Sequence, residues 1–258
     1  MKQPTQTRLI LKRALLAGWL CLSFLTTQTV SAAELTDECG TVLMQHTGAA
    51  LGLQAFKANA SAGKWSGIPE SAGEWTAAAM DGNRVLFFYE PKSLLALCTL
   101  DENGIPVEWL PLKGSFKKFS PVALEGNQIL IQKEKSGELK KIEFNKKGRI
   151  VSKKRIWKSS KGWVVRGMDS NRMVLEHAQT GKVAIWASNP TAALFRPYSS
   201  FTLDNGWSVR DFSGDYILIQ EGETGGVKLI ELGDGYVPDQ TTEIVSINEG
   251  WRAVALAL

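Results

Sequence analysis

Two histidines are the residues of this sequence best suited to proton transfer near neutral pH. His46 and His177 are its only histidines, and acid–base catalysis would require a partner group within reach of each. They lie in unrelated strand contexts, and neither has a Cys or Ser partner at a recognisable spacing. The sequence also contains no HExxH, GxSxG or phosphate-binding glycine loop. We therefore predict no catalytic residue, no metal ligand and no cofactor.

Three tryptophans outside the register of the aromatic residue that recurs every 44 positions are the first candidates for ligand contacts. Trp65, Trp109 and Trp157 each lie in a polar stretch beside a charged residue. Exposed aromatic rings beside polar groups are what a carbohydrate platform needs, because a ring face matches the apolar face of a sugar. Packing beneath a long loop is the alternative, and the sequence leaves it open.

Two arginines add directional hydrogen-bond donors to this set. Arg84 follows Asp81-Gly82-Asn83, and Arg172 follows Asp169-Ser170-Asn171. Turn chemistry alone explains the Asp, Gly and Asn residues, whereas a turn does not require an arginine. Because a guanidinium can donate several hydrogen bonds, we predict that Arg84 and Arg172 bind the ligand together with the three tryptophans.

A cationic segment is the strongest asymmetry of the chain. Residues 113–161 hold 15 Lys and Arg against 4 Glu, a local net charge of +11. Such a segment could bind an acidic polymer or an acidic protein, whereas nucleic acid is disfavoured because no recognition motif is present. A solvated edge is the alternative, since lysines also discourage edge-to-edge aggregation. The predicted anionic-partner strip consists of Lys140, Lys141, Lys146, Lys147, Arg149, Lys153, Lys154 and Arg155.

Residues 1–33 have the pattern of a cleaved secretory signal: a basic start, an apolar run and Ser31-Ala32-Ala33 as a cleavage site. A transmembrane anchor is the alternative, but Ser and Thr interrupt the run before the roughly 20 apolar residues of a span. Cleavage removes 4 of 30 Lys and Arg and none of 26 Asp and Glu, so residues 34–258 are formally neutral. We predict an extracytoplasmic protein, either secreted or periplasmic, without a membrane span.

Cys39 and Cys98 are the cysteines that remain after cleavage. In an oxidising compartment we predict a disulfide between them. Closing a loop of about 60 residues would stabilise the fold by roughly 4 kcal/mol. Two buried free thiols are the alternative. No CxxC spacing supports a zinc site or redox catalysis.

An aromatic residue that recurs every 44 residues organises the rest of the chain. Each copy precedes an apolar run, a Gly or Asn turn and further apolar runs, a pattern that predicts antiparallel hairpins. Four short strands in about 40–50 residues are typical of a propeller blade. Because the aromatic recurs in every unit, we predict a packing wedge between sheets rather than a ligand contact. Its positions are Trp75, Phe119, Trp163, Trp207 and Trp251.

The two ends of the chain complement each other. Only one predicted strand follows Gly250, whereas residues 34–74 lack that strand and contain those that should follow it. We therefore predict an all-β, five-bladed β-propeller with one blade shared between the termini, an arrangement that removes exposed sheet edges. A four-bladed ring with an N-terminal appendage is the alternative. The predicted units are the split blade 34–74 plus 251–258 and the blades 75–118, 119–162, 163–206 and 207–250.

The Gly-Trp step, the Asp-Gly-Asn turn and the following apolar strand resemble those of tachylectin-type and tectonin-type propeller lectins. The resemblance covers residues 34–258 as architecture and matches no individual sugar-contacting residue. It implies a non-enzymatic protein that binds carbohydrate through several similar sites, whose multivalency raises avidity. A cell-envelope scaffold that binds an acidic partner through the basic blade is the second hypothesis. A propeller glycosidase, which needs two opposed carboxylates, is the enzymatic alternative.

Overall fold

The predicted signal peptide lies outside the residues that the structure describes. Among the residues that the structure describes, no helix is long and apolar enough to cross a membrane. The computed structural model describes residues 38–46, 50–57, 62–68, 75–101, 104–133, 135–158, 162–169, 171–188, 195–222, 225–245 and 251–257.

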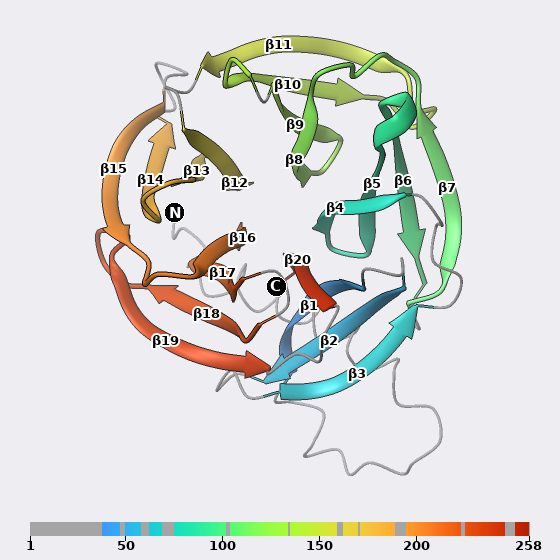
Figure 1. Cartoon of the computed structure of the whole chain (residues 1–258). Coiled ribbons are helices and arrows are strands. Elements are labelled where there is room, and N and C mark those ends of the chain that lie inside the picture. Colours follow the sequence, from blue (N-terminus) through green and yellow to red (C-terminus); the bar gives the residue numbers. More distant parts are fainter. Residues whose placement is uncertain are drawn as a thin grey trace, which may run out of the picture.

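Five four-stranded antiparallel sheets stand around a common centre as the blades of a propeller (Figure 1). Four of the blades are continuous in sequence, and each runs from an inner strand to an outer strand. Their strands are β4 (Thr76–Asp81), β5 (Arg84–Tyr89), β6 (Leu94–Leu100) and β7 (Pro106–Leu112); β8 (Ser120–Glu125), β9 (Gln128–Lys133), β10 (Glu138–Phe144) and β11 (Ile150–Lys158); β12 (Trp163–Asp169), β13 (Arg172–His177), β14 (Lys182–Ser188) and β15 (Phe195–Thr202); and β16 (Trp207–Ser213), β17 (Tyr216–Glu221), β18 (Val227–Leu232) and β19 (Pro238–Val245).

The fifth blade is shared between the two ends of the chain. β20 (Trp251–Ala257) is its innermost strand, followed by β1 (Glu38–His46), β2 (Leu51–Lys57) and β3 (Ala62–Ile68). β20 pairs antiparallel with β1, so that strands from opposite ends of the sequence complete one sheet. The predicted five-bladed fold with a shared blade is confirmed, and the four-bladed alternative is wrong.

A β-bulge interrupts every innermost ladder at the same place. In β4, for example, the pairing with β5 skips Ala78. In four blades the residue after the bulge is small and buried, because the inner strands approach one another closely there. In the remaining blade this residue is Asp211. A bulge residue leaves the ladder, and its side chain is re-aimed. The five bulge residues are Ala78, Val122, Arg166, Arg210 and Val254.

Apolar clusters between neighbouring blades form the core. One cluster joins Leu43 and Leu53 of the shared blade to Val85 and Phe87 of the next blade. Each of the five aromatic residues that recur every 44 residues is partly buried and packs against a different cluster, as predicted for a wedge between sheets. The five residues, each packed against its own cluster, are Trp75, Phe119, Trp251, Trp207 and Trp163.

The predicted disulfide between Cys39 and Cys98 is not found in the structure. Cys98, in β6, is a buried free thiol that packs in the cluster between the shared blade and the next one. Burial raises the pKa of its thiol to about 11, because an apolar environment disfavours the thiolate. Cys39 lies in β1, and its side chain is outside the described set. For Cys98 the free-thiol alternative therefore applies.

Candidate functional site

The three predicted ligand tryptophans are not brought together. Trp109, on the outer strand β7, is 43% exposed, with its ring centroid 5.0 Å from that of Phe87. Trp157, on β11 of the next blade, is half-buried and packs against Trp186 at 4.8 Å between ring centroids. Trp65 lies in β3, but its side chain is not among those described. Trp109 is thus the accessible member of the set among the described side chains.

A cavity of about 430 Å³ lies beside Trp109. This volume falls within the range of about 300–1,000 Å³ that is usual for small-molecule pockets. Ala96 and Pro111 are paired across β6 and β7, as are Cys98 and Trp109, so the pairs present their side chains on one face of the sheet. The lining is almost wholly apolar and consists of Trp75, Leu94, Leu95, Ala96, Trp109, Pro111 and Leu112.

Neighbouring rings hold the two tryptophans of this cavity in place. Trp109 packs against Phe87, and the ring centroid of Trp75 lies 5.4 Å from that of Tyr89. The Lys92 ammonium lies 5.8 Å from the ring centroid of Tyr89. Packing against neighbouring rings therefore sets two apolar walls before any ligand arrives.

Lysines cover the equivalent aromatic residue in two other blades. At the 44-residue period, the position of Ala96 corresponds to Lys140, Ala184 and Lys228. The Nζ of Lys140 lies 4.5 Å from the ring centroid of Phe119, and the Nζ of Lys228 lies 4.2 Å from that of Trp207. These contacts are cation–π interactions. Ala96 is too short to make such a contact, so Trp75 faces an open cavity.

The predicted cationic strip lies along β10, the following turn and β11, at the outer edge of one blade. Most of its members are exposed. Two of them also pack against an aromatic ring: Lys140 covers Phe119, and the Nζ of Lys153 lies 5.9 Å from the same ring centroid. Binding of an anionic partner by this strip stays a prediction.

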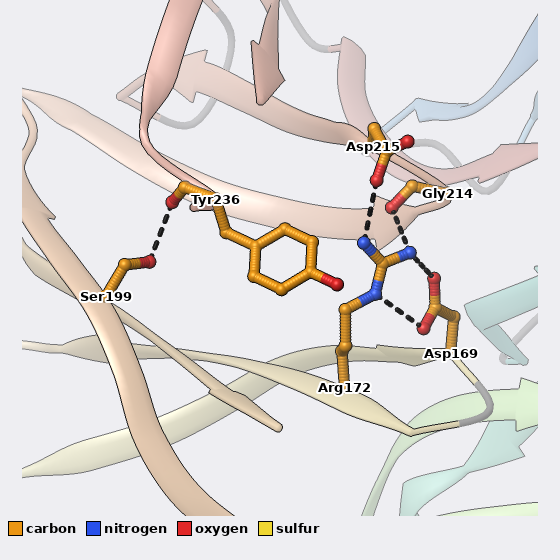
Figure 2. A network of polar contacts seen from close by, with 6 residues as sticks. All are labelled: Asp169, Arg172, Ser199, Gly214, Asp215 and Tyr236. Carbon is orange, nitrogen blue, oxygen red and sulfur yellow. Dashed lines mark hydrogen bonds and ion pairs between the residues drawn. The ribbon is translucent and has the colours of Figure 1, made fainter. Parts of the chain in front are cut away.

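Arg172 clamps two neighbouring blades together (Figure 2). Its guanidinium donates to Asp169 of its own hairpin, and also to the Asp215 carboxylate and the Gly214 carbonyl of the next hairpin, both at 2.7 Å. The guanidinium carbon lies 4.9 Å from the ring centroid of Tyr236. Burial would lower the pKa of Arg172, but the hydrogen bonds to Asp169 and Asp215 raise it above its ordinary value.

Arg84 makes the equivalent clamp two blades earlier. It donates to Asp81 at 2.7 Å and to the Gly126 carbonyl of the next hairpin at 2.8 Å. The Gly126 amide donates in turn to Asp81 at 2.8 Å. Contacts between blades therefore account for both arginines that a turn alone did not explain.

Replacing Arg172 by Met is expected to lower the free energy of unfolding by about 1–2 kcal/mol, because the charged hydrogen bonds between two hairpins are lost. The effect is modest because the Asp215 side chain is 61% exposed and water screens that pair. Urea unfolding measures the change, with Arg196→Met on the exposed edge of β15 as the control. Equal stability of the two variants would contradict the clamp.

Three glutamines that were not predicted as site residues also join neighbouring blades. They lie where the inner strands begin, whereas the arginine clamps lie at the turns where those strands end. Gln132 donates to the Trp163 carbonyl at 3.2 Å and accepts from the Val165 amide at 3.0 Å. Gln45 and Gln220 make the same pair of contacts to the blade that follows each of them. The 44-residue repeat could have indicated this shared role, since Gln132 and Gln220 are two repeats apart.

His46 and His177 occupy equivalent positions, although the sequence analysis treated them as unrelated. His46 packs edge-on against Trp251 at 5.2 Å between ring centroids, and His177 packs in the same way against Trp163 at 5.3 Å. Both histidines thus support the recurring aromatic residue. Within the described part of the chain, no group of three or more His, Cys, Asp or Glu side chains could hold a metal ion.

Comparison with known proteins finds similarity in structure. No protein-family model matches the chain, and no curated protein matches its sequence. A chain of a nidogen/laminin complex is 11% identical, with a TM-score of 0.54 over 84% of this chain and 97% of that one. The periplasmic gluconolactonase of Pseudomonas aeruginosa is 11% identical, with a TM-score of 0.43 over 84% and 70%. A putative 6-phosphogluconolactonase from Bacteroides uniformis is 13% identical, with a TM-score of 0.40 over 82% and 68%.

These findings correct the functional prediction. No family model supports the tachylectin and tectonin assignment, and the solved structure with a TM-score above 0.5 is only 11% identical, so the resemblance holds for the five-bladed fold alone. The residues expected to form repeated sugar sites are dispersed: Arg84 and Arg172 join blades, and Trp157 packs against Trp186. The multivalent lectin is therefore abandoned, and the anionic partner of the basic strip stays a prediction.

Proposed function

We propose that this protein binds an apolar ligand at one site, the cavity beside Trp75 and Trp109. The observation that carries the proposal is the uncovered aromatic wall. Trp109 and Leu94 are 43% and 38% exposed at the cavity, whereas lysines cover the equivalent ring in two other blades. A ligand with a flat hydrocarbon face, such as an aromatic ring or an acyl chain, fits these walls.

The lining favours a hydrocarbon over a polar ligand. Burial of apolar surface contributes about 25 cal/mol per Å², so covering about 100 Å² would contribute roughly 2.5 kcal/mol. A sugar hydroxyl buried in the same place without a hydrogen-bond partner would cost about 1–3 kcal/mol. The ring contacts of Trp75 with Tyr89 and of Trp109 with Phe87 restrain both side chains and so reduce the entropy lost when the ligand binds.

Replacing Ala96 by Lys is expected to close the site. The new side chain should lie over Trp75 as Lys140 lies over Phe119, and so exclude the ligand without removing a wall. Titration with the neutral dye N-phenyl-1-naphthylamine, whose emission rises in apolar surroundings, measures binding. We expect A96K to weaken binding at least about tenfold, a change of about 1.4 kcal/mol. Trp109→Ala should act in the same direction.

Val107→Ser is the matched control, because Val107 lies on the same strand, is 61% exposed and does not line the cavity. Its dye affinity should equal that of the wild type. Thermal unfolding of all three variants separates loss of the site from loss of the fold. Unchanged binding in folded A96K and W109A would contradict the proposal.

A further inference from the structure

The charges of this chain are segregated between two blades. Residues 119–162 hold 12 Lys and Arg against 4 Glu, a net charge of +8, whereas residues 207–250 hold 9 Asp and Glu against 2 Lys and Arg, a net charge of −7. Each of the three remaining blades has a net charge between −2 and +1. Residues 34–258 are formally neutral, so the charge of one blade balances that of the other.

The two charged blades are not neighbours in the ring. Their outermost strands, β11 and β19, lie at the rim, and the blade of β12–β15 stands between them (Figure 1). Among the described strands, β11 and β19 each pair with one neighbour, so the outer edge of each faces away from its own sheet. We name residues 145–158 the basic rim and residues 233–245 the acidic rim.

Opposite charges occupy equivalent places on the two rims. Lys146 and Asp234 lie two repeats apart, in the turn before the outer strand, and Arg155 and Glu243 lie two repeats apart within that strand. All four side chains are exposed. Because the spacing is the same on both rims, two rims in contact can align both pairs of opposite charges, whether the strands run parallel or antiparallel.

Repulsion within the basic blade destabilises its outer sheet. Lys141 is directly opposite Lys154 in the pairing of β10 with β11, and Lys140 is directly opposite Arg155. Like charges that face each other across two strands are destabilising. Glu138 pairs with Lys140 at 3.3 Å, but among the described residues no carboxylate is in an ion pair with Lys154 or Arg155. Carboxylates of another molecule would relieve this repulsion.

The acidic rim presents carboxylates that suit this role. Glu243 lies opposite Lys228 across β18 and β19, but the Lys228 ammonium covers the ring of Trp207 at 4.2 Å. The pairing of β18 with β19 skips Asp239, which is exposed, and a bulge re-aims the side chain that leaves the ladder. Within the described part of the chain, neither carboxylate of β19 is in an ion pair.

We infer that the partner of the basic rim is the acidic rim of a second copy of this chain. Two basic rims repel each other, as do two acidic rims, so unlike rims select each other and the contact is head-to-tail. Exposed ion pairs contribute little individually, so the association is weak and reversible. The contact uses no residue of the apolar cavity and does not depend on the function proposed for it.

Sedimentation velocity of the protein over a range of concentrations tests the inference at about 10 mM and about 1 M NaCl, where the Debye length is about 30 Å and about 3 Å. We expect association at low salt, with a dissociation constant at least about tenfold higher at high salt. Association that salt leaves unchanged or strengthens would overturn the inference, because apolar contacts would then drive it. A wild type that stays monomeric at low salt up to about 1 mM would overturn it too.

Charge reversal at the equivalent places tests the pairing of the rims directly. The double variant K146E/R155E should repel the unchanged acidic rim, and D234K/E243K should repel the unchanged basic rim. We expect each to raise the dissociation constant at least about tenfold at low salt. An equimolar mixture of the two variants should associate again, because Glu side chains at positions 146 and 155 then face Lys side chains at positions 234 and 243. A mixture that stays monomeric would overturn the inference.

The double variant K117E/K182E is the control, because it changes the net charge as much as K146E/R155E does, and both lysines are exposed and lie outside the two rims. Its dissociation constant should stay within about threefold of that of the wild type. Dextran sulfate bound by a wild type that does not self-associate would assign the basic rim to an anionic polymer and overturn the pairing. Thermal unfolding confirms that the variants are folded, and dye binding in the apolar cavity should be unchanged in all of them.

Discussion

The free energy of unfolding of the wild type is expected to fall by roughly 4 kcal/mol, through Asp211 alone, between about pH 4 and about pH 7. Asp211 is the residue that follows the bulge of β16, where three other blades have Ala and one has Gly167. Its carboxyl group is buried and accepts from the Leu256 amide of β20 at 2.8 Å. Burial raises its pKa from 3.8 to about 7, and hydrogen bonds from the Leu256 and Phe212 amides oppose this only in part.

The sign of the effect follows from proton binding. Below about pH 4 both the folded and the unfolded protein hold the proton on this carboxyl group, and the contribution of Asp211 to stability is at its highest. Between about pH 4 and about pH 7 the unfolded chain releases the proton while the folded protein retains it, so each pH unit destabilises the fold by about 1.4 kcal/mol. Above the folded pKa both states are ionised and the loss is complete.

Asp211→Asn is the test, because an amide has the same shape, does not titrate and can place its oxygen against the Leu256 amide. Urea unfolding at a series of pH values gives the free energy for each protein. The difference between the wild type and D211N isolates Asp211 from all other carboxylates. We expect D211N to gain relative to the wild type as the pH rises. A difference that is constant between pH 4 and pH 8, or that changes with the opposite sign, would refute the assignment.

Replacing Gln220 by Leu should lower the free energy of unfolding by about 3 kcal/mol. Gln220 is fully buried, donates to the Trp251 carbonyl at 3.3 Å and accepts from the Ala253 amide at 3.0 Å. Leu would leave both backbone groups buried without this partner, and each such group costs about 1–3 kcal/mol. Because β20 belongs to the shared blade, this loss weakens the closure of the ring.

The variant Gln220→Glu distinguishes the two hydrogen bonds. A carboxylate can still accept from the Ala253 amide but cannot donate to the Trp251 carbonyl. The protein already contains this arrangement at Glu176, which accepts from the Val209 amide and is neutralised by Arg166. Arg210 occupies in β16 the bulge position that Arg166 occupies in β12, so its guanidinium can neutralise the new carboxylate. We therefore expect Q220E to be destabilised less than Q220L. Gln240→Leu on the exposed strand β19 is the control, and a Q220L variant within about half a kcal/mol of it would refute the role.

The propeller fold could be predicted because the turn residues and apolar runs that specify it act over a few positions and recur in every repeat. The turn after each inner strand demands Gly or Asn, and the runs on both sides have strand composition, so one unit specifies one hairpin wherever it recurs. Because the same five aromatic residues pack against five separate clusters, their role as wedges could also be inferred. The glutamine contacts were equally periodic, but a buried Gln resembles a surface Gln in sequence, since burial depends on the neighbouring blade.

The candidate site could not be predicted, because exposure is decided by residues distant in sequence. Trp109 and Trp157 look alike in sequence, but Trp186 covers one while the short Ala96 leaves space beside the other. Asp169 is a local partner of Arg172, but only the next blade places Asp215 beside the same guanidinium. The direction in which Cys98 points was likewise unknown, and it faces an apolar cluster.

By itself, the sequence determined the repeat of 44 residues, the number of blades and the blade shared by the two ends. These depend on turn chemistry and on the alternation of apolar residues, which act over a few positions. Only the tertiary structure decided which side chains are available to a ligand. That choice depends on contacts across the gap between two sheets, and folding creates those contacts between residues 30 to 45 positions apart.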